Sequence, residues 1–339
     1  MITRYVNTAS TAGGNGTTND IVGANRAFAT LQEAETQLTG DNYDDDLEIL
    51  CCGSAADTVA SFDQDSYVTA GHTLYIKGNR GDATGYHGGV WNASTYRIIY
   101  NSHCLLINTN RRTIIDGIQL HNSSDVYSNG IYMMKGTTDS EIKNCVIRFV
   151  AGSSGIAVGS TYINLKIYNN IISGVNGYYA GCIFFSSPQA TTTKVYNNLL
   201  TNAVYGIRSA NGQYIKNNII FDCYDDIDGS ATIDHCASDD GDGTNPISVS
   251  SWADQFHNPN YAAEFDFSLT GTSVLLDAGI GPDSDANVPT TDILAYDRSG
   301  LTATVGAFEH EWDWSPVVPS TSNEIQFFGQ LHGQLHGQE

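Results

Sequence analysis

Four aspartates close together in the chain could carry acid–base chemistry. They are Asp222, Asp225, Asp226 and Asp228, and Asp116 is a more distant candidate. A glycoside hydrolase needs two carboxyl groups about 5–10 Å apart, one as proton donor and one as base or nucleophile. Aspartate is also an ordinary turn-forming residue. The cluster therefore fits either a catalytic pair or a structural turn, and we assign none of these residues a catalytic role.

A second acidic stretch offers oxygen ligands for a cation. It runs from Ser238 to Thr244 and contains Asp239, Asp240 and Asp242. Ca²⁺ prefers carboxylate and carbonyl oxygens, so a Ca²⁺ site at these aspartates is one hypothesis. A solvated loop is the alternative. We expect no other metal and no cofactor.

The seven cysteines show no spacing typical of a metal site. Four of them stand where the repeats described next place small apolar core residues, and we expect them to be reduced and buried. These four are Cys145, Cys182, Cys223 and Cys236.

The elements that must position these groups are short, repeated strands. One phrase occurs four times: an apolar residue, a Lys or Tyr, an Asn, an Asn or Cys, and two apolar residues. The copies begin at Ile142, Ile167, Val195 and Ile215, and their leading Asn residues recur every 20–28 residues. A second phrase, Gly followed by an apolar residue, occurs at Gly130, Gly155, Gly181 and Gly206. Periods of this length predict a solenoid, in which each coil buries its apolar face against the next.

The leading Asn of each copy is predicted to form a structural ladder. Stacked coils lie about 4.8 Å apart. Asn tolerates left-handed backbone angles at a bend, and its amide can bond the same amide in the coils above and below. The predicted ladder consists of Asn144, Asn169, Asn197 and Asn217.

The residues on either side of this Asn define two candidate surfaces. Strand alternation points the preceding residue outward, which gives a column of Lys143, Tyr168, Tyr196 and Lys216. Such a column suits stacking on sugar rings or on a partner's side chains, although exposed tyrosines on strands are also common. After the Asn, alternation leaves an exposed apolar stripe of Val146, Ile171, Leu199 and Ile219. A stripe of this kind is typical of an interface, unless the bend breaks the alternation and buries both apolar residues.

The composition excludes some classes of function. A net charge of −22 argues against nucleic acid as a partner, because its phosphates need Lys and Arg. No apolar run is long enough to cross a bilayer, so we expect no membrane insertion. The N-terminus lacks the basic and then apolar pattern of a secretory signal peptide, and we expect synthesis in the cytoplasm without one.

One helix is predicted before the solenoid. Thr30 and Glu33 form a capping box, and Leu31, Ala34 and Leu38 continue an apolar stripe that starts at Phe28. The helix is expected to cover the open end of the first coil. The chain then divides into an N-terminal cap (1–40), the coils (41–245), a C-terminal capping segment (246–311) and a linker with an apolar tail (312–339).

The C-terminal capping segment carries a series of short motifs that extends the pattern. They are Phe256-His257-Asn258-Pro259-Asn260-Tyr261, Asp266-Phe267-Ser268-Leu269, Ser273-Val274-Leu275-Leu276-Asp277-Ala278-Gly279, Asp297-Arg298 and Val305-Gly306-Ala307-Phe308-Glu309. With these motifs, the chain to about residue 310 resembles the pectate-lyase-like, right-handed parallel β-helix superfamily. It departs from the capping pattern at Val274 and Thr304, where the pattern has Pro and Asp. The resemblance implies an all-β fold: a right-handed, single-stranded parallel β-helix with an N-terminal amphipathic capping helix and a C-terminal β cap.

This resemblance is specific for fold and leaves function open, because the superfamily includes lyases, hydrolases, viral spikes and adhesins. The Asn-Thr-Asp, Gly-Asp-Asp, Gly-His-Gly and Arg-Ile-Lys signatures of its hydrolases are absent from the sequence. Its pectate lyases use Ca²⁺ carboxylates with an Arg or Lys base. Arg208 and Lys216 are available for that role, but no surrounding motif matches.

Two classes of function follow. The first is a structural or adhesive virion-type protein, a phage capsid-surface or tail component without enzymatic activity that can bind surface glycans. Its partners would be other virion subunits or further copies of itself, for example in a trimer, and a cell-surface polysaccharide. It would leave the cell by lysis. The second is a polysaccharide lyase or glycoside hydrolase, a depolymerase that acts on an extracellular glycan. The missing signatures favour the first class.

The end of the chain is a candidate docking tail. Phe327, Phe328, Leu331 and Leu335 follow a linker that contains Pro316 and Pro319. An apolar strand of this kind can add to another subunit. A disordered terminus is the alternative.

Deletion of residues 320–339 tests the docking tail. If the tail joins subunits, the truncated protein should elute as a smaller species than the full chain in size-exclusion chromatography with light scattering. A full chain that is already monomeric and is unaffected by the deletion would contradict the docking role.

Overall fold

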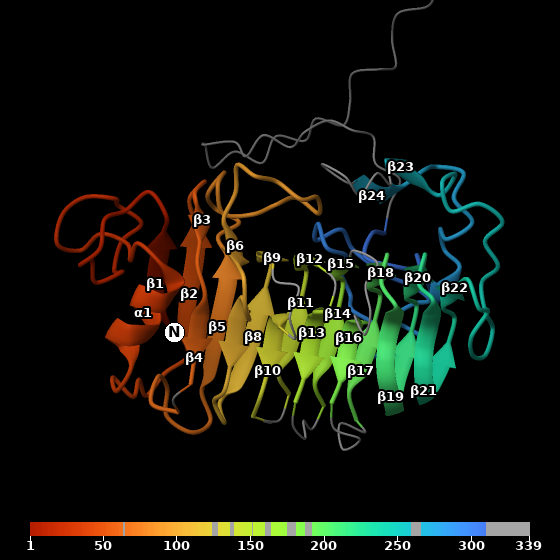
Figure 1. Cartoon of the computed structure of the whole chain (residues 1–339), viewed down its shortest axis with the longest axis horizontal. Helices are drawn as coiled ribbons and strands as arrows, with labels where there is room; N and C mark the ends of the chain where they lie inside the picture. The colour runs from red at the N-terminus through yellow and green to blue at the C-terminus, as the bar shows by residue number, and fades with distance from the viewer. Residues whose placement is uncertain are drawn as a thin grey trace, which may run out of the picture.

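The protein is a rod of stacked coils in the computed structural model, which describes residues 1–63, 65–123, 128–135, 139–150, 152–159, 164–174, 181–186, 192–258 and 266–309. Figure 1 shows the strands side by side along the rod, from β1 near the N-terminus to β21 and β22. No helix in the described ranges is long and apolar enough to cross a membrane. The candidate docking tail (Phe327, Phe328, Leu331 and Leu335) lies outside the described residues.

The strands form three faces, and each strand pairs in parallel with the equivalent strand of the next coil. The first face contains β4 (Ala60–Phe62), β7 (Leu105–Ile107), β10 (Asn129–Met133), β13 (Ser154–Val158), β16 (Gly181–Phe185) and the first parts of β19 (Tyr205–Lys216) and β21 (Asp225–Asp234). The second face contains β1 (Ile2–Asn7), β2 (Leu47–Cys52), β5 (Thr73–Gly78), β8 (Arg112–Asp116), β11 (Glu141–Lys143), β14 (Lys166–Tyr168), β17 (Lys194–Tyr196) and the last parts of β19 and β21. The third face contains β3 (Ala56–Asp57), β6 (Arg97–Tyr100), β9 (Gln119–Asn122), β12 (Val146–Phe149), β15 (Ile171–Ser173), β18 (Leu199–Thr201), β20 (Ile219–Phe221) and β22 (Ala237–Ser238). This architecture confirms the predicted right-handed, single-stranded parallel β-helix.

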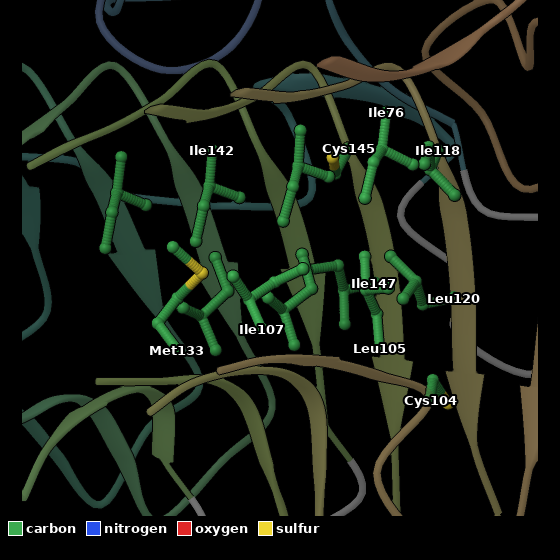
Figure 2. Packing of buried hydrophobic residues seen from close by; sticks show 14 of the residues in the cluster. Ile76, Cys104, Leu105, Ile107, Ile118, Leu120, Met133, Ile142, Cys145 and Ile147 are labelled. Atoms are coloured by element: carbon green, nitrogen blue, oxygen red, sulfur yellow. The ribbon is translucent and has the colours of Figure 1, made fainter. Parts of the chain in front are cut away.

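The core consists of columns of like side chains, one from each coil. Along the second face the register places Ile76, Ile115, Ile142, Ile167 and Val195 over one another, all fully buried. Figure 2 shows Ile76 and Ile142 in one such row. On the first face, Met133 pairs with Ile107, while Leu105 of the same strand belongs to the neighbouring column. Because the side-chain period of a strand is two, a slip of one residue would turn a whole column toward solvent.

The N-terminal helix α1 (Leu31–Leu38) lies at one end of the rod (Figure 1). The Thr30 hydroxyl accepts a hydrogen bond from the Glu33 amide at 3.0 Å, which is the predicted N-cap contact. Leu31, Ala34 and Leu38 are buried in the same apolar cluster as the first coils. The helix therefore closes the core at this end.

The corner between the second and third faces is built by the repeated Asn. Asn144, Asn169, Asn197 and Asn217 all adopt left-handed backbone angles, with φ of 54–55°. Their amide groups line up along the rod: Asn169 Nδ2 donates to Asn144 Oδ1 at 3.3 Å, and Asn217 Nδ2 to Asn197 Oδ1 at 3.5 Å. The four residues therefore occupy one corner in successive coils.

A second, inner ladder lies directly beside the first and was not predicted. It consists of Asn170, Asn198 and Asn218, which are all fully buried. Asn170 Nδ2 donates to Asn198 Oδ1 at 2.9 Å, and Asn198 Nδ2 donates to Asn218 Oδ1 at 3.0 Å. Each Oδ1 also accepts the backbone amide of the preceding coil, for example Asn170 N to Asn198 Oδ1 at 3.0 Å. This ladder pairs the backbone groups that the corner would otherwise leave buried and unbonded.

The C-terminal segment, described at residues 246–258 and 266–309, folds back along this corner. It contains two short antiparallel pairs, β23 (Phe256–Asn258) with β24 (Asp266–Leu269) and β25 (Gly279–Ile280) with β26 (Thr302–Ala303). Its backbone bonds the outer Asn ladder: Asn169 Nδ2 donates to Thr291 O at 2.8 Å, and Asn197 Nδ2 to Thr304 O at 3.1 Å. The segment therefore covers the side of several coils.

This arrangement corrects the predicted exposed stripe. Val146, Ile171, Leu199 and Ile219 are all buried, with exposed fractions of 0–1 %. The alternation holds, because the neighbouring Ile147, Ile172, Leu200 and Ile220 belong to the core of the rod. The outward residues instead form a second apolar cluster with the C-terminal segment, including Leu275, Ile293 and Val305. The stripe is an interface within the chain.

Replacement of Asn198 by Ala tests the inner ladder. The change leaves the buried Asn170 N–H without its acceptor and removes one hydrogen bond each from the Ile167 carbonyl and Asn170 Nδ2. We expect the free energy of unfolding to fall by at least about 2 kcal/mol, since each buried unsatisfied group costs about 1–3 kcal/mol. Urea unfolding followed by circular dichroism would measure it. The matched control is Asn25→Ala at an exposed amide, and an equal effect of both substitutions would contradict a structural role for the ladder.

Candidate functional site

The predicted column of Lys143, Tyr168, Tyr196 and Lys216 lies on the second face in the expected register. Its members are not an open aromatic row. Lys143 Nζ and Tyr168 Oη both bond Glu141 Oε2, at 2.9 and 2.8 Å. Tyr196 is only 2 % exposed, because the C-terminal segment passes over this part of the column, where Lys216 bonds Asp285 at 2.9 Å. The prediction of an exposed glycan platform is therefore corrected at Tyr196, and Lys216 lies in a pocket described below.

The aspartates proposed for chemistry are separated by the fold. Asp116 pairs with Lys143 on the second face and accepts a hydrogen bond from Asn144 Nδ2 at 2.6 Å. Asp116 lies one residue before the Asn corner, which the register gives to Gly117, with φ of 70°. Asp222, Asp225, Asp226 and Asp228 lie at the first face and the turn before it, near the end of the rod.

The acidic loop after the last coil is held by its own carboxylates. Asp239 Oδ2 accepts the Asp222 amide at 2.9 Å, and Asp240 Oδ2 accepts the Asp226 amide at 3.1 Å. Among the described residues, no group of three or more His, Cys, Asp or Glu side chains is arranged to hold a metal ion. The Ca²⁺ hypothesis for Asp239, Asp240 and Asp242 stays a prediction.

Asp226 is the most unusual of these carboxyl groups. It points into the rod and is fully buried. Its Oδ2 accepts the amides of Asp239 and Asp240, at 2.6 and 3.2 Å, whereas its Oδ1 has no hydrogen-bond partner among the described residues. Burial, together with the nearby charges of Asp239 and Asp240, raises the pKa of Asp226 to about 7. Its position suits a structural anchor for the acidic loop, since its side chain is buried and holds two amides of that loop.

A groove on the outer side of the first face brings together a different set of residues. It encloses a volume of about 400 Å³. The register aligns Tyr132, Ala157, Phe184 and Arg208 in one outward column, and Asn129, Ser154, Gly181 and Tyr205 in the next. His103, Ser128 and Ser186 complete the polar lining.

The groove combines aromatic faces with one cation. The Arg208 guanidinium lies over the Phe184 ring at 5.3 Å and over the Tyr205 ring at 5.1 Å from their centroids. At the other end, the His103 ring is 5.0 Å from the Tyr132 ring, and its Nδ1 accepts the Asn129 amide at 3.1 Å. Burial lowers the pKa of His103. Arg208 is therefore the fixed positive charge of the groove, held in place by the two rings beside it.

Two carboxylates continue the outward columns beyond Arg208. Asp225 pairs with Tyr205 in the next coil, and Asp228 follows Ile227, the partner of Ile207. Burial raises the pKa of Asp225, and the charges of Asp228 and Asp240 raise it further. A carboxyl group with a raised pKa suits the role of general acid toward a glycosidic bond. Arg208, which lines the groove, is thus followed in the next coil by two aspartates on the same face.

The sequence reading missed the aromatic column because of one glycine. Gly181 pairs with Ser154, so Cys182 takes the position that Gly155 and Gly206 hold in the neighbouring coils. At Gly206 a side chain would collide with Ile220 Cγ2 at 2.3 Å, which explains why the phrase recurs. Shifting the third copy by one residue aligns Phe184 with Tyr132 and Arg208. This one-residue shift of the Gly181 copy is the sequence signal from which the aromatic column could have been predicted.

Comparisons with known proteins place few constraints on this chain. No family model matches it, and no curated protein sequence matches it. Among solved structures, the crystal structure of pectate lyase Pel9A is similar, with a TM-score of 0.37 and 12 % identity over 91 % of this chain and 96 % of that one.

Stability should depend on pH through Asp226. Its pKa is about 7 in the folded protein and about 3.9 in an unfolded chain. Between these values the folded state binds more protons, so this group's contribution to the free energy of unfolding falls as pH rises from about 4 to 7. Asp226→Asn removes the ionisation and should raise the free energy of unfolding at pH 8 by about 1–3 kcal/mol, with a smaller change at pH 5. Urea unfolding of both proteins at the two pH values would measure it.

The exposed Asp283→Asn serves as control, because it removes the same charge without a buried carboxylate. If Asp226→Asn and Asp283→Asn shift stability equally at both pH values, the buried, proton-binding role of Asp226 is excluded.

Proposed function

We propose that the protein binds a polysaccharide in the groove of the first face. The observation that supports this most is the alignment of Tyr132 and Phe184 in one outward column with Arg208. Aromatic faces pack against the C–H surfaces of sugar rings, and the hydroxyl and amide groups of Ser154 and Asn129 can bond sugar hydroxyls.

The spacing within the column suits an extended ligand. Tyr132 and Phe184 are two coils apart, which corresponds to about 10 Å along the rod. The intervening position is Ala157, whose small side chain leaves room between the rings. A chain of sugar units that runs along the rod axis could therefore contact both rings and reach Arg208.

Arg208 favours an acidic sugar at the end of this chain. A guanidinium binds carboxylates in a planar, two-point geometry, and Phe184 and Tyr205 hold its plane in place. The net charge of −22 opposes long polyanions. We therefore propose a glycan in which acidic units are interspersed with neutral ones.

A second candidate function is cleavage of the bound glycan, as a lyase or hydrolase. Asp225 and Asp228, which follow Arg208 on the same face, favour it. In a hydrolase, Asp225 would serve as the acid because its pKa is raised, and Asp228 as the base. Substitution of both aspartates by Asn should then abolish the release of new reducing ends or unsaturated uronates while binding is kept.

The virion-type setting is part of the same proposal. An adhesive coat or tail protein would use the groove to attach to a cell-surface polysaccharide, and a depolymerase on the same particle would use it to cut that polysaccharide. Assembly with other subunits or as a homo-oligomer stays a prediction.

Phe184→Ala and Arg208→Ala test the groove. Loss of one stacked ring should weaken glycan binding about tenfold, which corresponds to roughly 1.4 kcal/mol. Arg208→Ala should weaken binding to acidic glycans more than to neutral ones. Microcalorimetry with ligands chosen from a glycan array would measure both effects.

Tyr224→Ala is the matched control, because Tyr224 is 86 % exposed and lies outside the groove. If Phe184→Ala binds the selected glycan as tightly as the unmodified protein, or if Tyr224→Ala loses as much affinity, the groove is not the binding site.

A further inference from the structure

A second pocket opens on another side of the rod, between the last coils and the C-terminal segment. It has a volume of about 530 Å³, within the range of small-molecule sites. The coils contribute Lys216 and His235, and the C-terminal segment contributes Ile280, Ser284, Leu301 and Thr302. None of these residues lines the groove of the first face.

His235 occupies the corner that Asn fills in the preceding coils. Its φ is 50°, in the same left-handed region as the outer ladder. In the three preceding coils the Asn side chains bond the C-terminal segment, as Asn217 Nδ2 does with the Ile280 carbonyl at 2.7 Å. The His235 ring instead bonds its neighbour Asp234, with 2.7 Å between Nδ1 and Oδ1. In this coil, therefore, the corner residue does not join the rod to the C-terminal segment. Its imidazole lines the pocket instead.

Asp234 fixes the role of this imidazole. Its Oδ1 also accepts Asn245 Nδ2 at 3.1 Å, which holds the carboxylate in place. In the neutral imidazole, with Nδ1–H donating to Asp234, Nε2 carries a lone pair. His235 therefore offers the pocket a hydrogen-bond acceptor.

Lys216 supplies the complementary donor. Its Nζ bonds Asp285 Oδ2 at 2.9 Å and lies 4.0 Å from Asp234 Oδ2. An ammonium has three N–H groups, so at least one is available to a ligand. Asp285 is itself held by the Asn287 amide at 3.0 Å and by Tyr196 Oη at 3.4 Å, which positions the lysine.

The charges inside the pocket and the side chains at its rim indicate which kind of molecule it can bind. Two carboxylates beside one lysine make an anion unfavourable. Leu301 is 71 % exposed at the rim and, with Ile280, offers an apolar surface next to the hydroxyl groups of Ser284 and Thr302. We propose that this pocket binds a neutral, hydroxyl-rich molecule, a single sugar unit, with one hydroxyl donating to His235 Nε2 and another oxygen accepting from Lys216.

The test is a titration of the full chain, labelled with ¹⁵N-histidine, with glucose, galactose and mannose, and with glucuronate as the anionic comparison. At least one neutral sugar should shift the His235 ring signals in a saturable way in the millimolar range, and glucuronate should bind at least about tenfold more weakly. His235→Asn identifies the signal. This variant should fold, because Asn fills the same corner in four coils.

Two variants separate this pocket from the groove. Lys216→Met should abolish the shift of the His235 signals, and Phe184→Ala should leave it unchanged even though it impairs the groove. The absence of a saturable shift with all of the neutral sugars would overturn the proposal. So would equal binding of glucuronate, or a shift that survives Lys216→Met.

Discussion

Side-chain amides at the corners of the coils are the constraint on which this structure depends. A corner interrupts the hydrogen bonds of the flanking strands, and the interrupted groups are buried. An Asn side chain carries both a donor and an acceptor, so Asn198 can bond the carbonyl of Ile167 at 2.9 Å while it accepts the amide of Asn170 at 3.0 Å. Repetition of this unit gives each coil the same bend, and for that reason the outward side chains of successive coils form straight columns.

The C-terminal segment depends on the outer ladder in turn. The left-handed corner directs the amides of Asn169, Asn197 and Asn217 away from the core, where they bond the backbone of the segment. The buried Arg298 strengthens this contact, because it bonds Asn169 Oδ1 at 2.6 Å and is neutralised by Glu309 at 2.7 Å. The apolar stripe along the third face is then covered by the chain itself. Its burial explains why a stripe that alternation places outside need not bind another protein.

The sequence predicted the structural features that recur in every coil. It did not predict features that depend on a single residue or on contacts between distant parts of the chain. The solenoid, the helix at Leu31–Leu38 and the corner at Asn144 could be read from periodicity and capping residues alone. The inner ladder corresponds to the second Asn of each Asn-Asn pair in the sequence, but only the first Asn of each pair was predicted to form a ladder. The groove required the true register of Gly181, which only the pairing with Ser154 reveals. The cover over Tyr196 required knowledge of where residues far along the chain, such as Asp285, return to the rod, and no local pattern encodes that.

The path of the C-terminal segment has a consequence for how such a protein can evolve. Repeat arrays commonly gain and lose units by duplication, since each unit contacts only its neighbours. Here the C-terminal segment is hydrogen-bonded to Asn169, Asn197 and Asn217, which lie in three successive coils. An inserted coil would move one of these hydrogen-bond partners by about 4.8 Å, which would break the hydrogen bond. The C-terminal segment therefore fixes the number of coils in the part of the rod that it contacts. The number of coils elsewhere in the rod can change.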